Sequence, residues 1–388
     1  MKKTVLLILV LTVALHVSLF ALCVPILNYA EGWTTFYWDS HYLSYALFQY
    51  GVGEVVRQFF LQYFAHSIIG ILMTMIVALL VAVLAMVIIR LFCKKTGWLY
   101  LSLVPSWLAS MGLLALISPN GLSALTVRFT PAGQQQTQYI EMSNMVRKQD
   151  WAGIIARCDE GGRVTNLLTQ NFLNMALAEK GLLGQCLYDE PCIDIRSVYI
   201  DAIQNEDFAV LLSDIYYSMG HIAQSQRYAF ELNEKKNDFS PRLLMRLVQT
   251  NIIYGQYAVA EKYIRWLEKT VYYKTWAMSQ RRFLYHDDAV AKDAEYGVKR
   301  RCLITDNRFS GIKGLDDDLL HVARQTRGTV QCRTTLQYLG ALYLLAHYNQ
   351  QFVSLCDEFP EYQLTQQKYF ADAYKKLKGG NRKWKQLT

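Results

Sequence analysis

The chain has 388 residues, 52% of them hydrophobic, and a formal net charge of +8. Up to about residue 117 it is mostly apolar, whereas the part beyond residue 128 has the composition of a water-soluble helical protein. That second part carries 33 basic and 29 acidic residues, too mild a balance for nucleic-acid binding, which needs a strongly basic surface. The composition excludes a nucleic-acid-binding protein and points to two domains, one of them in a membrane.

Three long apolar stretches, at about 5–26, 67–89 and 98–117, contain no Lys, Arg, Asp or Glu. About 20 apolar residues in an α-helix, at roughly 1.5 Å per residue, cross a bilayer core about 30 Å thick. An ionised side chain near the centre of such a helix is costly. The sequence therefore predicts a membrane domain over residues 1–120 with three transmembrane helices, and the lipid bilayer as a partner.

The first stretch also has features of a secretory signal peptide, because Lys2 and Lys3 precede its apolar run. No small-x-small cleavage site closes the run, and Leu22 before Cys23 does not match a lipoprotein signal. We predict that the first span is retained, with cleavage as the alternative. Either outcome leaves the direction of the later spans unchanged.

Basic residues beside the spans predict their direction. Lys and Arg concentrate in cytoplasmic loops, and the loop at 28–66 contains only Arg57. We therefore expect the N-terminus and the second loop in the cytoplasm of a bacterium, and the C-terminal domain in the periplasm after three crossings of the inner membrane. The residues that set this topology are Lys2, Lys3, Arg90, Lys94 and Lys95.

The loop between the first two spans is rich in Trp, Tyr and Phe, and Trp and Tyr favour the headgroup layer. From about residue 44 to residue 64, apolar residues recur at helical spacing opposite a polar face. This pattern predicts an amphipathic helix in the membrane interface, with Gly51 and Gly53 as positions that kink the helix or delay its start. The apolar face consists of Phe48, Val52, Val55, Phe59 and Tyr63, and the polar face of Glu54, Arg57, Gln58 and Gln62.

Asp39 lies in the same loop, after Trp38, and is a weak candidate for a catalytic residue. Multi-pass sugar transferases that use lipid-linked donors often carry an acid in the first outer loop, ahead of an interfacial helix. Such a carboxylate can act as a base or hold a metal ion. Three spans are few for the cavity of such an enzyme, so a hydrated loop Asp is the favoured interpretation.

After a linker at 121–135, the region at 136–388 shows internal similarity in place of strand patterns. A Gly ends one helix, an aromatic residue opens the next, and a small residue lets the two pack closely. This pattern predicts an all-α chain in which the spans are followed by a tetratricopeptide-like helical-repeat domain, an α-solenoid with a concave face for a protein partner. The residues that define two units, 35 positions apart, are Gly220, Ile222, Ser225 and Tyr228, and Gly255, Tyr257, Ala260 and Tyr263.

Motifs of catalysis are missing from the sequence: it has no phosphate-binding Gly loop, nucleophile elbow, zinc-protease motif or kinase signature. No cofactor and no metal site is predicted.

Cys186 and Cys192, six positions apart, are the candidate disulfide, with buried thiols as the alternative. The cysteines beyond residue 128 are Cys158, Cys186, Cys192, Cys302, Cys332 and Cys356.

Four segments together resemble a known family: GVGEVVRQFFLQYF (51–64), QDWAGIIARC (149–158), YYSMGHIAQSQRYAFE (216–231) and NIIYGQYAVAEKYIRWLEKTVYYKTWA (251–277). They resemble an uncharacterised bacterial family of multi-pass membrane proteins with a tetratricopeptide-like C-terminal region. Members of that family carry more spans, so the chain looks like a shortened member. The resemblance implies no activity and no catalytic residue.

Our leading hypothesis is a membrane-anchored protein-interaction or scaffold module of the bacterial cell envelope, without a catalytic constellation. One alternative is an enzyme, or the remnant of one, that acts on lipid-linked envelope sugars through Asp39. Another is an accessory subunit of a transporter.

Overall fold

The computed structural model describes residues 2–118, 130–161, 166–189, 194–200, 206–236, 240–304 and 312–379. Among these residues the secondary structure is entirely helical, without a strand, which confirms the predicted all-α fold. Packing divides the chain into two compact units. Unit 1 comprises Met1–Asn144, Asp238–Arg242 and Arg265–Met278, and unit 2 comprises Met145–Asn237, Leu243–Ile264 and Ser279–Thr388.

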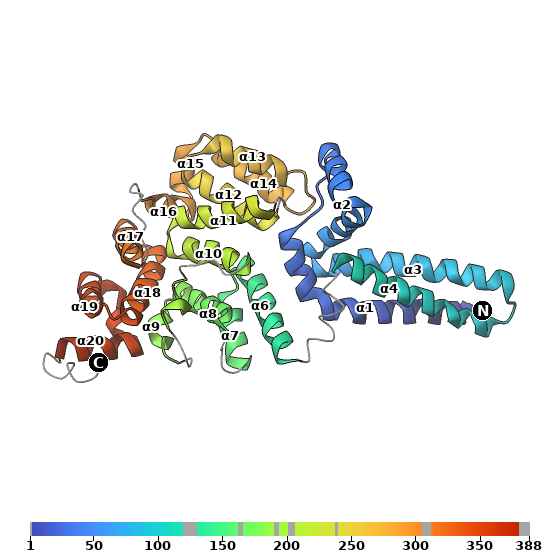
Figure 1. Ribbon diagram of the computed structural model, residues 1–388, viewed down its shortest axis with the longest axis horizontal. Helices are drawn as coiled ribbons and strands as arrows, with labels where there is room; N and C mark the ends of the chain where they lie inside the picture. Colours follow the sequence, from blue (N-terminus) through green and yellow to red (C-terminus); the bar gives the residue numbers. More distant parts are fainter. Residues whose placement is uncertain are drawn as a thin grey trace. The chain divides into compact units, whose positions relative to one another are not determined.

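Unit 1 contains the three apolar helices that the sequence predicts. They are α1 (Lys2–Trp33), α3 (Ser67–Phe92), and η2 (Thr96–Ser102) continuing into α4 (Leu103–Ile117). Each is long and apolar enough to cross a membrane. The helices α1, α3 and α4 lie side by side as an elongated bundle (Figure 1), and each packs against the other two.

In α3, small residues face the inside of this bundle and large apolar residues face outwards. Gly70, Ala78 and Ala82 of α3 are buried, and a Cβ at Gly70 would collide with the Phe64 ring. Leu80 and Leu84 of α3 point outwards and are largely exposed. Helices associate in lipid through such close backbone packing, because leucine side chains gain nothing by leaving the acyl chains. The bundle therefore has the surface of a membrane domain.

A polar junction joins the three helices near the middle of the bundle. The fully buried His16 of α1 lies 2.9 Å from Ser110 Oγ of α4 and 3.0 Å from Thr74 Oγ1 of α3. Its ring stacks on Phe20, with centroids 4.3 Å apart. An imidazole away from water needs partners for both nitrogens. This junction therefore aligns α1, α3 and α4 with one another.

Two further helical elements connect the first two spans: α2 (Ser40–Leu61) and η1 (Gln62–Ala65). Gly51 interrupts α2 with a φ of 83° and a ψ of 174°. This backbone conformation is open to Gly and strained for other residues, so the predicted bend occurs where the sequence has a Gly.

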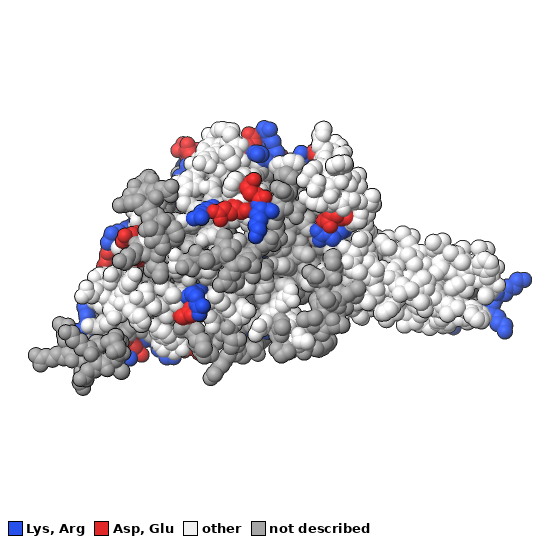
Figure 2. Space-filling view, viewed as in Figure 1, with Lys and Arg blue, Asp and Glu red and all other residues white. Residues whose placement is uncertain are grey.

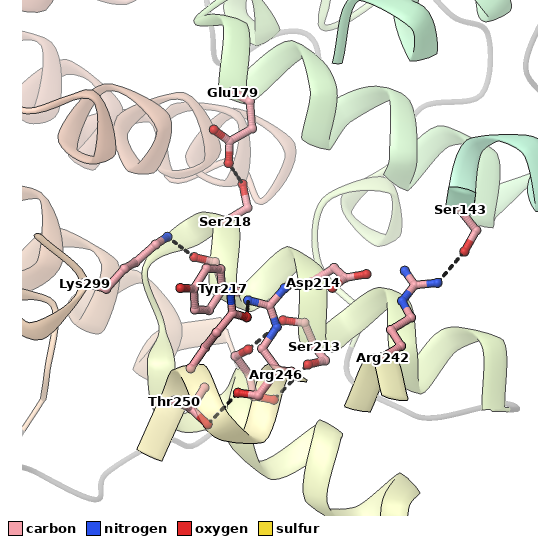
Figure 3. A network of polar contacts seen from close by, with 12 residues as sticks. Ser143, Glu179, Ser213, Asp214, Tyr217, Ser218, Arg242, Arg246, Thr250 and Lys299 are labelled. Carbon is pink, nitrogen blue, oxygen red and sulfur yellow. Dashed lines mark hydrogen bonds and ion pairs between the residues drawn. The ribbon is translucent and has the colours of Figure 1, made fainter. Parts of the chain in front are cut away.

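Later parts of the chain pack onto the C-terminal end of α1 within unit 1. From α6 (Pro131–Arg147), the Asn144 amide donates to the Pro25 carbonyl at 2.9 Å. The Ser240 hydroxyl donates to the Gly32 carbonyl at 3.0 Å. Arg242 donates to Ser143 at 2.7 Å (Figure 3). Ser240, Arg242 and the segment Arg265–Met278 thus belong to the membrane unit, although they lie far along the chain.

The remaining helices belong to unit 2, except that some of them contain a boundary between the two units. They are α7 (Trp151–Gly161), α8 (Leu167–Lys180), α9 (Leu183–Cys186), η3 (Ile195–Ser197), α10 (Glu206–Met219), α11 (Ile222–Lys236), α12 (Pro241–Ile253), α13 (Tyr257–Leu267), α14 (Lys274–Gln280), η4 (Arg281–Phe283), α15 (Asp287–Lys292), α16 (Tyr296–Arg301), α17 (Ile312–Gln325), α18 (Val330–Leu345), α19 (Asn349–Glu358), η5 (Pro360–Tyr362), η6 (Leu364–Gln366) and α20 (Lys368–Gly379).

Two of these helix pairs contain the motif that defines the sequence repeat. Gly220 between α10 and α11 has a φ of 90°, and Gly255 between α12 and α13 has a φ of 73°. Both are left-handed conformations that commonly end a helix. The other motif residues follow in the second helix of each pair: Ile222, Ser225, Tyr228, Tyr257 and Ala260 are buried, and Tyr263 is half-buried.

Helix α18 is the centre of unit 2, since 13 of its 16 residues are buried. It packs against the sequence neighbours α17 and α19 and also against the distant α8, α9 and α10. In an open solenoid each repeat contacts only its neighbours. Unit 2 is therefore a more closed arrangement than the curved rod that the repeat pattern suggests.

Phe370 of α20 fixes the last helix in this arrangement. Its ring lies over Gly184 of α9 and Gly340 of α18, where a Cβ on either Gly would collide with it. Phe370 itself is fully buried. The two glycines therefore form a slot that the aromatic ring fills.

We predict that His16→Ala lowers the unfolding free energy of the detergent-solubilised protein by about 1–2 kcal/mol, because it removes two interhelical hydrogen bonds and leaves a small void. Titration with a denaturing detergent, followed by circular dichroism, measures this. Leu15→Ala, at a lipid-facing position one residue away, is the control and should cost less. Equal effects of the two changes would contradict the junction's role.

In unit 2, Gly340→Ala should lower stability by about 1–3 kcal/mol, because the new methyl group overpacks the slot of Phe370. The Cβ would lie 2.8 Å from the ring carbons. Gly379→Ala meets open space and should be neutral or slightly stabilising, since Ala favours a helix over Gly. Thermal unfolding of the full-length protein compares the two. A neutral Gly340→Ala would show that α20 does not dock as described.

Candidate functional site

The first polar cluster lies in unit 1, at the C-terminal end of α1. Glu31 is fully buried there, and the Tyr273 hydroxyl donates to its carboxylate, with oxygen–oxygen distances of 2.7 and 2.8 Å. Burying a carboxylate is costly unless it is hydrogen-bonded. Our sequence analysis missed Glu31, although a signal exists: it is the only charged residue between Lys3 and Asp39.

Asp39, the weak catalytic candidate, holds two structural elements. Its Oδ1 accepts the backbone N–H of Tyr42 at 2.9 Å and so caps the start of α2. Its Oδ2 lies 2.8 Å from Lys269 Nζ. The Lys269 ammonium, followed by the Tyr42 N–H, lowers the pKa of the Asp39 carboxyl below its ordinary 3.8. A carboxylate stabilised in this way is a weaker base than a free one.

The Arg265–Met278 segment makes further contacts with the loop after α1. The Trp38 N–H donates to the Lys269 carbonyl at 2.7 Å. The Trp266 ring meets Tyr37 edge-on at 5.9 Å and also lies 4.3 Å from Lys269 Nζ. Tyr272 meets Tyr63 and His66 edge-on. The aromatic residues of the loop thus serve partly as a docking surface for this segment.

This first polar cluster attaches a later segment of the chain to the end of α1 and the loop that follows it. Glu31 and Asp39 each bind a side chain of the Arg265–Met278 segment, through Tyr273 and Lys269. Among the described residues no group of three or more His, Cys, Asp or Glu side chains could hold a metal ion. What the geometry supports is attachment of a later chain segment to the loop between the first two spans.

The second polar cluster lies in unit 2, around Tyr217 of α10 (Figure 3). The Arg246 guanidinium lies 3.7 Å, and the Lys299 ammonium 4.4 Å, from the centroid of its ring. Its hydroxyl donates to Glu295 at 2.5 Å. Arg246 also pairs with Asp214 at 2.9 Å. Because cations are attracted to aromatic faces, Tyr217 connects α10, α12 and α16.

Lys299 is only 8% exposed. Its ammonium donates to the Tyr217 carbonyl and, at 2.5 Å, to Gln331 Oε1 of α18. Burial lowers the pKa of this amine from its ordinary 10.5, since removal from water disfavours the charged form. Its amine therefore joins the C-terminal end of α10 to α16 and α18.

The other residues that the sequence analysis named fall into three groups. Lys2, Lys3, Arg90, Lys94 and Lys95 are exposed, and Figure 2 shows Lys and Arg at one tip of the bundle beside flanks without charge. Cys186 is half-buried, and Cys192 lies outside the described residues, so their pairing stays a prediction. The polar-face residues Gln58 and Gln62 are buried, whereas the apolar-face residues Phe48 and Val52 are exposed.

The fold defines a helical protein with apolar helices long enough to span a membrane. In each of its two compact units, charged side chains connect helices or segments that are far apart in the sequence. Its sequence matches a family of unknown function, DUF6057, over residues 107–377. The chain belongs to this family, and the match to an uncharacterised family confirms that part of the expected resemblance. No curated protein and no solved structure matches the chain.

We predict that Asp39→Asn and Asp39→Ala differ in hydrogen exchange. Asn caps helices as well as Asp does, so Asp39→Asn should keep the cap on the Tyr42 amide but lose the ion pair with Lys269. Hydrogen exchange of the Trp38 amide should therefore speed up more than exchange of the Tyr42 amide. Asp39→Ala should speed both. Because the pKa of Asp39 lies below 3.8, the contribution of the pair should persist as the pH falls to that value and disappear only below the lowered pKa.

Mass spectrometry with single-amide resolution measures these rates, and molar salt should weaken the partly exposed pair. If both variants exchange like the wild type, the Lys269 contact does not form in solution.

For unit 2, Lys299→Met should lower stability by about 1–3 kcal/mol, because it leaves the Tyr217 carbonyl and Gln331 Oε1 without this donor. Arg301→Met, an exposed neighbour on α16, is the control and should change stability by less than about 0.5 kcal/mol. Denaturant unfolding of the full-length protein compares them.

The same pair of proteins gives a pH dependence. The pKa of Lys299 is lower in the folded protein than its ordinary 10.5. Between these two values the unfolded chain binds more protons, so the stability of the wild type relative to Lys299→Met should rise with pH. A difference that falls with pH in this window would contradict the burial of the amine.

Proposed function

We propose that the protein is a membrane-anchored scaffold of the bacterial cell envelope. Its three spans anchor it in the inner membrane, and its tetratricopeptide-like helix pairs bind a protein partner. The observation that carries this proposal is the use of the charged residues: Glu31, Asp39 and Lys299, which catalysis could employ, each hold helices or segments together. Stable helix pairs commonly present surfaces for other proteins.

The distribution of charge supports the proposed direction in the membrane. Ile8 near the start of α1 packs against Met86 of α3 and Leu99 of η2. The N-terminus and the connection between α3 and η2 therefore lie at the same end of the bundle. All five of the topology-setting basic residues belong to that end, which the positive-inside rule assigns to the cytoplasm.

Contacts within unit 1 support the number of crossings. The Arg265–Met278 segment follows all three spans in sequence and binds the loop between the first two, through Lys269 on Asp39. Both must lie on the same side of the membrane. This requires an even number of crossings between them, as two transmembrane helices, α3 and α4, would provide.

The enzymatic alternative receives less support. A lipid-linked sugar transferase would need Asp39 available to its substrate, whereas both oxygens of Asp39 have partners within unit 1. Asp39→Ala should therefore leave envelope glycans unchanged. A change in their composition would favour the enzyme.

Reporter fusions test the proposed topology. We expect a C-terminal alkaline phosphatase fusion to be active, since this reporter works only in the periplasm, and a C-terminal green fluorescent protein fusion to stay dark after export by the general secretory route. The opposite pattern would overturn the proposed direction.

Recovery of a partner tests the scaffold. The exposed aromatic residues Phe230 and Tyr285 of unit 2 are of the kind that dominates protein interfaces, where loss of a central one weakens binding by about 2 kcal/mol or more. A partner bound to unit 2 should be recovered with the wild-type protein from mildly solubilised membranes and, if these residues contribute, less with Phe230→Asp or Tyr285→Asp. Consistent failure to recover any partner would contradict the proposal.

A further inference from the structure

Several apolar side chains of the helix α2 are exposed, whereas two glutamines at its C-terminal end are buried. Phe48 is 91% exposed and Val52 is 68% exposed. Gln58 and Gln62 are buried, and Gln58 accepts the Tyr42 hydroxyl at 3.0 Å. A helix on a protein surface in water normally shows the opposite distribution. The outward face of α2 therefore fits an apolar environment.

The charges of α2 cancel locally. Glu54 and Arg57 are the only Asp, Glu, Lys or Arg residues between Ser40 and Leu61. Arg57 Nε donates to Glu54 at 2.6 Å, and the Gln58 amide donates to the same carboxylate at 3.0 Å. With no net charge to attract acidic partners or anionic headgroups, burial of apolar area is what α2 offers to an occupant.

The direction of α2 fits the plane of a membrane. Figure 1 shows α2 running across the axis of the bundle formed by α1, α3 and α4, near the end of the bundle at which α1 finishes. If the bundle crosses the bilayer, a helix across its axis lies along the bilayer surface. The capping and ion-pairing of Asp39 fix the start of α2 in this unit.

The apolar surface of α2 also continues that of the spans. The helix packs against η1, α3 and α4, and the first turns of α3 expose Ile68, Ile69 and Leu72. Trp38 and Tyr45, which are also exposed, belong to the residue types enriched at the boundary between headgroups and acyl chains.

We propose that the outward face of α2 is immersed in the bilayer leaflet at that end of the bundle, where it binds lipid acyl chains irrespective of headgroup charge. The inference depends on the membrane anchoring proposed above. Phe48, which is 91% exposed, lies before Gly51, and the bend at Gly51 lets both parts of α2 follow the surface.

Photo-crosslinking tests this in the full-length protein. A benzophenone amino acid replaces Phe48, and in separate proteins it replaces Leu80 of α3 or Phe230 of α11, which are also exposed. Each protein is reconstituted into vesicles with radiolabelled acyl chains, made either of phosphatidylcholine alone or of phosphatidylcholine with phosphatidylglycerol. We expect position 48 to yield lipid adducts at a level close to that of position 80 and several-fold above position 230, equally in both kinds of vesicle.

The other possible outcomes would contradict either the lipid contact of α2, the membrane anchoring or the independence from headgroup charge. Lipid adducts at position 80 together with none at position 48 would show that α2 does not contact lipid, and would leave the proposed membrane anchoring intact. Adducts at neither position would remove the proposed anchoring as well. A crosslink from position 48 to a second copy of the chain would identify a protein contact in place of lipid, and adducts only with phosphatidylglycerol would show that headgroup charge matters.

Discussion

The organisation of unit 1 depends on one constraint: a polar group away from water needs a partner, and in lipid it must find that partner within the protein. His16 meets this requirement through Thr74 and Ser110, and it thereby places α1 against both α3 and α4. The same constraint explains Glu31 at the end of α1. Its buried carboxylate needs a donor, and the Tyr273 hydroxyl, from a segment more than 240 residues away, provides it.

Because of these polar contacts, the membrane unit includes more than the spans. The segments that carry Ser240, Lys269 and Tyr273 lie within the helical-repeat region of the sequence, yet they pack on α1 and the loop that follows it. The proposed anchored scaffold would benefit from this arrangement, since a later part of the chain is tied to unit 1 at several points in addition to the covalent connection. The ion pair between Asp39 and Lys269 is one of these attachments.

In unit 2 the corresponding constraint is the burial of charge among closely packed helices. Lys299 and Arg246 lie against the ring of Tyr217, and their other contacts reach α10 and α18. Burying such cations favours one arrangement of helices, because any other would leave them without partners. The slot that Gly184 and Gly340 form for Phe370 acts similarly through shape, since a Cβ on either Gly would collide with the ring.

Features that depend on local composition and spacing can be predicted from the amino-acid sequence. The length of the apolar stretches predicts α1, α3 and α4, and the positions of Gly51, Gly220 and Gly255 predict a bend and two helix ends, because their backbone conformations favour Gly. Which distant residues meet depends on the packing of the whole chain. The pairing of Glu31 with Tyr273, the burial of Lys299 and the central place of α18 arise from contacts between residues far apart in the chain, for which periodicity carries no signal. The same reason applies to Asp39: its residue type allows catalysis or capping, and the contacts with Lys269 and the Tyr42 N–H are visible only in the folded chain.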